Sequence, residues 1–201
     1  MSISTYAELK TAVANRLRRS DTASYVDDWI LLAETDIYRR LRTKEMETAL
    51  SDTIASGVVA LPSGYIDLKF AYINRTPVTR LKRKTVAWIY ENYPLRSASA
   101  CPVFVAREGS NLIFGPYPDS AYSIAGIYYK NLGAVSSTAH ALFTANPDVY
   151  LFGSLYMAVR DQKDDKGIAR WQPLYEMALA SAQKASDAEE VSGGGLEMTC
   201  S

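Results

Sequence analysis

The sequence predicts an α+β protein in which helices at both ends of the chain flank a block of β-strands. Apolar residues recur at three- and four-residue spacing near both ends, which is the period of an amphipathic helix. The middle is rich in Thr, Val, Ile and Tyr and is interrupted by Gly and Pro, as strands joined by turns are. Neither helical end has another partner for its apolar face. We therefore expect a four-helix layer with an inserted antiparallel β-sheet or sandwich.

This pattern predicts four segments along the chain. They are an N-terminal helical hairpin (1–45), an inserted β domain with a short helix (46–131), a C-terminal helical hairpin completing the bundle (132–190) and a flexible C-terminal arm (191–201).

Two helices are predicted before residue 45. Thr5 and Glu8 have the spacing of a capping box, in which each side chain satisfies a free amide of the first turn. Ser24, three residues before Asp27, predicts the start of the second helix. The apolar stripes expected to be buried are Tyr6, Leu9, Val13 and Leu17 in the first helix, and Val26, Ile30, Ala33, Ile37 and Leu41 in the second.

The middle segment predicts five or six strands. A hairpin is expected where Val103–Arg107 and Asn111–Gly115 flank a turn at Glu108–Ser110. One short helix interrupts the strands, beginning near Thr85 and ending before Pro94.

Helices return after residue 145. Asn146 as N-cap and Pro147 at the first helical position are a preferred pair. Gly153 predicts close approach of another backbone, and a final helix is expected from about Ile168 to Glu190. The buried residues expected in these two helices are Val149, Phe152, Leu155, Tyr156, Val159, Trp171, Leu174, Tyr175, Ala178, Leu179 and Ala182.

Composition excludes several classes of protein. The 201 residues carry 22 basic and 22 acidic side chains, without the cationic excess of a dedicated nucleic-acid binder. No apolar run approaches the ~20 residues of a membrane span, and the N-terminus lacks the pattern of a secretion signal. Cys101 and Cys200 are far apart and His140 is the only histidine, so we expect no disulfide framework, metal site or cofactor.

No arrangement of residues predicts catalysis. Asp27–Asp28 and Asp164–Asp165 are adjacent carboxylates, and neighbours on a helix point in different directions. We therefore interpret both pairs as surface charge and not as acid–base couples. His140 has no Ser, Cys or Asp at a spacing that indicates a catalytic triad, and it is expected at the surface. The carboxylates of the strand region show no spacing that favours a glycosidase, so a hydrolytic or carbohydrate-binding module is the least favoured hypothesis.

The basic stretch from Thr79 to Thr85 leaves two interpretations open. Its residues lie close to Tyr72 and Trp88, and basic side chains beside aromatic rings can grip a nucleic acid. Lysines and arginines also protect exposed edge strands from unwanted pairing, and the zero net charge favours this reading. The possible DNA-facing residues are Arg80, Lys82, Arg83 and Lys84.

The chain resembles the head-to-tail adaptor proteins of tailed bacteriophages over nearly its whole length. The blocks that carry the resemblance occur in the family's order: "TYAELKTAVANRLRRSD", "YVDDWILLAETDIYRRLRTKEME", "VALPSGYIDLKFAYIN", "REGSNLIFGPYPDSAYSIAGIYYKN", "ANPDVYLFGSLYMAVRDQKDD" and "WQPLYEMALASAQKAS". The resemblance implies a structural virion protein without catalytic residues, made in the bacterial cytoplasm. It also implies a ring of identical subunits, twelve in number, that sits on the portal protein, extends the DNA channel and offers a platform for tail or nozzle proteins.

Two sets of residues follow from that resemblance. A portal-binding arm would comprise Gly193, Gly194, Gly195, Leu196 and Met198. A ring needs each copy to present two different faces, and the 14 tyrosines suit surfaces of that kind. The expected subunit interface comprises Tyr150, Phe152, Tyr156, Trp171 and Tyr175.

Overall fold

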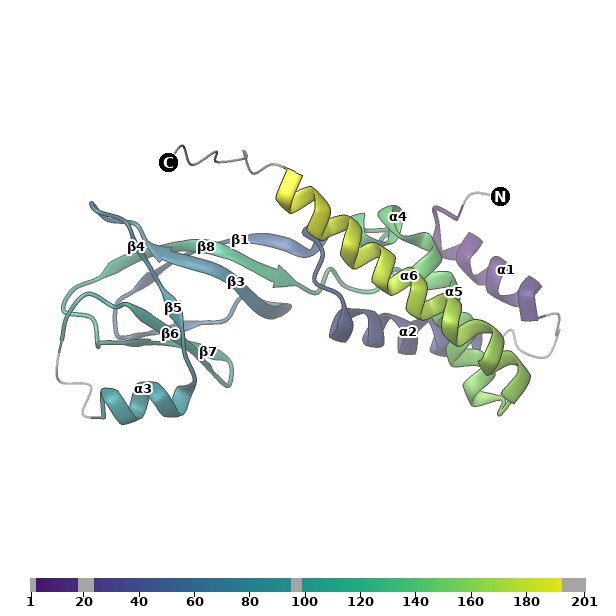
Figure 1. Cartoon of the computed structure of the whole chain (residues 1–201), viewed down its shortest axis with the longest axis horizontal. Coiled ribbons are helices and arrows are strands. Elements are labelled where there is room, and N and C mark those ends of the chain that lie inside the picture. Colours follow the sequence, from purple (N-terminus) through teal and green to yellow (C-terminus); the bar gives the residue numbers. More distant parts are fainter. Residues whose placement is uncertain (1–2, 18–23, 95–98, 193–201) are drawn as a thin grey trace, which may run out of the picture. The chain divides into compact units, whose positions relative to one another are not determined.

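The computed structural model describes residues 3–17, 24–94 and 99–192. It contains helices and two four-stranded sheets, which confirms the predicted α+β class. The chain forms two compact units (Figure 1). Residues 1–45 and 132–201 belong to one, called here the helical unit, and residues 46–131 form the other, the β unit.

The helical unit is built around α5, which packs against α2 and α6, while α1 contacts α5 and α2. The bounds are α1 Tyr6–Leu17, α2 Val26–Arg40, α4 Ala141–Ala145, α5 Pro147–Asp161 and α6 Asp165–Ser192. The final helix is thus longer at both ends than predicted, and α4 was predicted as a loop.

The helix starts show which capping predictions hold. Thr5 N donates to Glu8 Oε2 at 3.0 Å and Glu8 N donates to Thr5 Oγ1 at 3.3 Å, which confirms the capping box. The cap expected from Ser24 is wrong, because α2 begins at Val26 with Tyr25 in the cap position and no side-chain bond.

At the start of α5, Pro147 occupies the predicted place but Asn146 does not cap with its side chain. Asn146 also ends α4, and its Nδ2 donates backward to Leu142 O at 3.4 Å. The residue therefore serves the end of the preceding helix, and its side chain is not available to the next one.

Most residues of the predicted stripes lie in the core of the helical unit, whereas Tyr6, Leu17 and Leu174 are only partly buried. Leu9 and Val13 of α1 are fully buried, and the whole predicted stripe of α2 is at most 2% exposed. Gly153 is a point of close approach, but its neighbours are side chains and not the backbone that we expected. A Cβ on Gly153 would lie 2.9 Å from the Tyr175 ring and 3.3 Å from Ala33 Cβ.

The β unit is a sandwich of two four-stranded sheets. The first has the order β1 (Glu47–Ile54), β8 (Tyr122–Lys130), β3 (Tyr65–Ile73), β4 (Thr79–Arg80). The second has the order β2 (Val58–Ala60), β7 (Asn111–Gly115), β6 (Phe104–Glu108), β5 (Lys82–Arg83).

The strand prediction was incomplete in two respects. The described residues form eight strands and not five or six, since β2, β4 and β5 are too short to show a period in the sequence. β5 also pairs with β6 in parallel, whereas we expected antiparallel pairing throughout. The hairpin of β6 and β7 is confirmed, with Gly109 in its turn at φ 56°.

Apolar residues from both sheets meet between them. This core consists of Leu50, Ile54, Val59, Leu68, Ala71, Ile73, Leu81, Val105, Leu112, Phe114, Ile124 and Tyr128. A smaller cluster, Ile89, Ala106 and Ile113, lies between α3 (Val86–Asn92) and the second sheet. The predicted start of α3 is confirmed, because Thr85 Oγ1 accepts from Trp88 N at 3.2 Å.

Candidate interaction surfaces

The described residues contain no cluster of three or more His, Cys, Asp or Glu that could hold a metal ion. Among the same residues, no helix has the length and hydropathy to cross a membrane.

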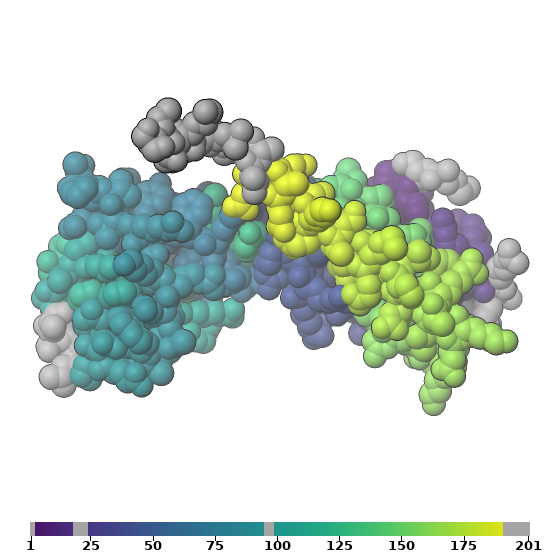
Figure 2. All heavy atoms as spheres, in the orientation of Figure 1, coloured from purple at the N-terminus to yellow at the C-terminus, as the bar shows by residue number. Residues whose placement is uncertain are grey.

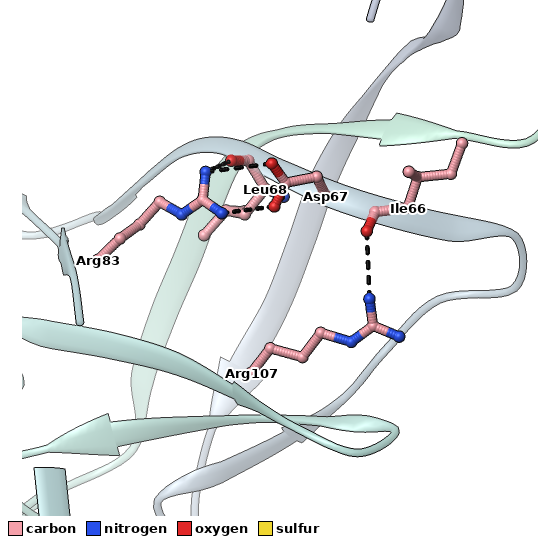
Figure 3. Close-up of polar contacts among 5 residues, drawn as sticks. All are labelled: Ile66, Asp67, Leu68, Arg83 and Arg107. Carbon is pink, nitrogen blue, oxygen red and sulfur yellow. Dashed lines mark hydrogen bonds and ion pairs between the residues drawn. The ribbon is translucent and has the colours of Figure 1, made fainter. Parts of the chain in front are cut away.

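The four residues of the basic stretch, Arg80, Lys82, Arg83 and Lys84, have different contacts in the structure. Arg83 on β5 turns toward β3, where its Nη1 donates to Leu68 O at 2.7 Å and its guanidinium pairs with the Asp67 carboxylate (Figure 3). This guanidinium is half-exposed, but its donors already have partners within the unit. Arg83 is thus a link between the two sheets.

Arg107 on β6 makes a second link of the same kind. Its Nη1 donates to Ile66 O at 3.2 Å, and its guanidinium carbon lies 5.4 Å from the centre of the Tyr65 ring (Figure 3). Ile66 and Leu68 are two residues apart, so their carbonyls leave the same edge of β3. The two guanidinium groups supply donors to that edge at a point where the register of β3 with β8 is irregular.

No sequence pattern predicts the role of Arg107, because it occupies an ordinary polar position of the hairpin. Arg83 and Arg107 border a pocket of about 210 Å³ that Tyr65 and Asp67 also line. This volume is below the ~300 Å³ at which typical ligand pockets begin. The carboxylate of Asp67 also offsets the cations, so we assign the pocket no ligand.

The remaining members of the basic stretch are not gathered at one point. Lys84 Nζ lies 4.7 Å from the centre of the Trp88 ring and 5.9 Å from that of Phe104, a cation–π arrangement. Arg80 and Lys82 are exposed, and their side chains make no hydrogen bond or ion pair with the described residues. Within the basic stretch, these two are the residues whose charges have no partner in the described part of the chain.

The predicted subunit interface divides into buried and surface residues. Tyr150 and Tyr175 are 0% exposed, so their side chains belong to the core of the helical unit and cannot form part of an external surface. The Tyr175 hydroxyl donates to Asp36 Oδ2 at 2.8 Å, which explains how a polar ring is accommodated there. Phe152 and Tyr156 on α5 are half-buried, and Phe152 stacks on the largely buried Trp171 with centroids 6.2 Å apart.

A polar cluster fastens the segment before α4 to α2. Glu34 is only 5% exposed and accepts from Val135 N at 2.7 Å, and burial raises the pKa of its carboxyl. The Tyr38 hydroxyl donates to Gly133 O at 3.0 Å.

His140 belongs to the same cluster and is half-buried, so the expectation of a surface histidine is wrong. Its Nδ1 accepts from Phe143 N at 3.3 Å, which caps α4, and its Nε2 lies 3.1 Å from the Tyr38 hydroxyl. Burial lowers the pKa of this imidazole. These contacts hold the segment in place and leave no ring nitrogen without a partner.

Large apolar side chains remain exposed on the helical unit. Leu31 and Leu32 on α2 are 56% and 53% exposed, and Met177 on α6 is 68% exposed. Figure 2 shows α6, light green to yellow, forming much of one face of this unit. These residues lie outside the stripes that the helical period predicts to be buried, so the period does not identify them.

The outer side of α2 also borders a shallow groove against α5. Its volume is about 440 Å³, and its lining residues are Leu32, Thr35, Asp36, Arg39, Met157, Arg160 and Asp161. The groove combines an apolar floor with charges of both signs, as protein–protein surfaces often do. The predicted portal-binding arm, Gly193 to Met198, lies outside the described residues.

Comparison with known proteins places the sequence in a family. No curated protein is significantly similar to the sequence. The sequence does match the family described as SU10 adaptor protein over residues 4–196, which is almost its whole length. The chain therefore belongs to this family of phage head–tail adaptors, whose members are structural components of the virion.

Proposed function

We propose that the protein forms an adaptor ring at the junction between phage head and tail. Its partners are the portal protein on one side and tail or nozzle proteins on the other, and the ring, with twelve copies, forms part of the channel for duplex DNA. The family match over residues 4–196 is the observation that carries this proposal. The exposed Met177 on α6 supports it, because a ring needs surfaces that neighbours cover.

The decisive experiment mixes the purified protein with its portal and images the mixture by electron microscopy. We expect a ring of additional density on the portal and no ring in the protein alone. Two-dimensional class averages with the symmetry left free would give the copy number. Portal particles without added density, at protein concentrations well above that of the portal, would contradict the proposal.

The segment from Gly193 to Met198 is proposed as the portal-binding arm. Replacing Leu196 and Met198 together by Asp would remove its apolar side chains, and we expect portal binding to weaken at least tenfold. The matched control is Glu197→Gln, which changes a neighbouring side chain without removing an apolar contact. Equal binding by both variants would show that the arm is not the portal contact.

Sequence-independent DNA binding is a second candidate function. The observation in its favour is that Arg80 and Lys82 are exposed and have no partner among the described residues. It predicts duplex binding that falls steeply with salt and is lost when Arg80 and Lys82 become Ala. Arg107→Lys is the control, because Arg107 is committed to β3. Negligible binding at low salt would leave the adaptor role alone.

A further inference from the structure

α2 turns a second stripe of residues to solvent, opposite the stripe that it buries. Positions 28, 32, 35 and 39 follow helical spacing and share one face, with Leu31 beside them. Two adjacent leucines, 56% and 53% exposed, lie at its centre. The outer stripe of α2 is defined here as Asp28, Leu31, Leu32, Thr35 and Arg39.

The charges at the two ends of this stripe have no partner in the described part of the chain. Asp27 is held by Tyr6 and Lys10, and Arg40 pairs with Glu176. In contrast, Asp28 and Arg39 make no hydrogen bond or ion pair with the described residues and are exposed. The outer stripe therefore runs from an acid, through apolar side chains, to a base.

We propose that the outer stripe of α2 pairs antiparallel with the same stripe of a second copy of this chain, about a two-fold axis. Asp28 and Arg39 lie on opposite sides of the centre of the stripe, at equal distances from it along the helix. Antiparallel pairing therefore sets each Asp28 opposite Arg39 of the other copy, and each Leu32 opposite Thr35. A two-fold contact requires a surface that is complementary to itself in this way, and antiparallel helix dipoles add to the attraction.

Other helix pairings satisfy the charges less well. Parallel pairing of two α2 helices would place Asp28 beside Asp28 and Arg39 beside Arg39. The other exposed apolar side chain, Met177, has Arg170 and Lys184 seven residues to either side on the outer face of α6. If Leu32 packed against Met177, Arg39 would lie beside Lys184 in a parallel pairing and beside Arg170 in an antiparallel pairing. Charge complementarity therefore selects a second α2.

The expected pair is weak and separate from the ring. One pair of 15-residue helices buries an area near or below the lower limit of about 1,200 Å² for stable complexes, so we expect micromolar association. A cyclic ring is built from contacts between two different faces, whereas this contact joins like faces. The proposal therefore concerns the free protein and does not rest on the proposed function.

Sedimentation velocity on the full chain, from about 5 to about 500 μM, tests the pairing without any portal. We expect a reversible monomer–dimer equilibrium, and Leu32→Glu should weaken it at least tenfold. Met177→Glu is the matched control, since it places the same charge at the most exposed apolar residue outside the stripe. Circular dichroism would verify that both variants keep their helices.

Charge exchange tests the antiparallel register. Asp28→Arg and Arg39→Asp should each weaken the dimer about tenfold, and the variant with both changes should associate like the original chain. A monomer at every concentration, or a dimer that survives Leu32→Glu, would overturn the proposal. Failure of the double variant to recover association would overturn it as well.

Discussion

The helical unit and the β unit differ in how they accommodate polar groups. The helical unit buries several of them, including the Glu34 carboxylate and the Tyr150 and Tyr175 rings, and matches most with partners on other segments. The β unit keeps an almost wholly apolar core and places its arginine links at the surface. Stability in the first unit therefore depends on hydrogen bonds between distant segments, and in the second on packing between sheets.

The units also differ in continuity and charge. The β unit is one uninterrupted segment, whereas the helical unit is assembled from both ends of the chain. The β unit contains nine basic and six acidic residues, and the helical unit contains 13 basic and 16 acidic residues, so the zero net charge conceals opposite balances. A composition for the whole chain is thus a poor guide to either surface.

The largest expected effect comes from separating the units. Residues 46–131 expressed alone should fold cooperatively, because both of their cores are formed within that segment. Residues 1–45 alone should remain largely unfolded, because α5 is what covers the buried face of α2. Circular dichroism with thermal melts measures both. A disordered 46–131 fragment would show that the β unit depends on the helices.

Two glycines test how rigid each unit is. Gly126→Ala would place a Cβ 2.8 Å from Ala71 Cα and against Phe70 O, and this backbone cannot move without disturbing the sheet. We expect a loss of about 3 kcal/mol in the free energy of unfolding. Gly153→Ala meets the Tyr175 ring, which can shift, and gains helix propensity, so its loss should be about 1 kcal/mol.

Chemical denaturation with the two unfolding transitions resolved would rank these variants. Gly109→Ala serves as the control for backbone conformation, because it has open space around it but a φ of 56°. A Gly153→Ala variant less stable than Gly126→Ala would contradict the comparison.

Glu34 should make the stability of the helical unit depend on pH. Its pKa is raised by burial above the ordinary value of 4.5, so the folded state binds this proton more tightly than the unfolded state does. The free energy of unfolding should therefore fall as pH rises from about 4.5 through the folded pKa. Glu34→Gln, which keeps an oxygen to accept from Val135 N, should remove that decline.

Glu176 provides the opposite sign as a control. The hydrogen bond from Arg40 lowers the pKa of Glu176, so its contribution is present above the unfolded value and is lost as pH falls through the folded pKa. Urea denaturation between pH 4 and pH 7 would separate the two. An unchanged slope in Glu34→Gln would show that burial of Glu34 does not govern the profile.

The smallest effect is expected at the first helix cap. Glu8→Ala removes the acceptor of the Ser4 and Thr5 amides and should lower the melting temperature only slightly, because these hydrogen bonds are exposed to solvent. Glu8→Gln keeps an acceptor and should lower it less. Thermal melts monitored at 222 nm would detect the difference, and equal losses in the two variants would argue that charge, and not the hydrogen bonds, is what matters at this position.

The sequence predicted those features that are determined locally. The Thr5–Glu8 box, the Thr85 cap and the β6–β7 hairpin each depend on residues a few positions apart, and each is confirmed. Arg83 and Asp67 are 16 residues apart, and their pairing depends on how two sheets stack, which no spacing reveals. Likewise, the spacing identified Gly153 as a close approach but could not identify Tyr175 as the neighbour.

The candidate surfaces were harder to predict for a related reason. Residues 30–33 of α2, Ile-Leu-Leu-Ala, are continuously apolar, so the period alone does not show that Leu31 and Leu32 face outward. Tyr150 is expected at the subunit interface because tyrosine suits interfaces, and Tyr175 is expected both there and in the apolar stripe of its helix, yet both side chains are internal. Burial depends on which helices meet, and that information is not local.

The pairing of β1 with β8 has a consequence for how this chain could have arisen. Glu47 lies opposite Tyr129, so the point where the chain enters the β unit and the point where it leaves are neighbours. The 86 residues of the β unit therefore connect the two parts of the helical unit as a short hairpin loop would. Closing this connection costs little extra conformational entropy. A module joined in this way can be exchanged for another, or shortened to a turn, while the scaffold that carries it keeps its fold.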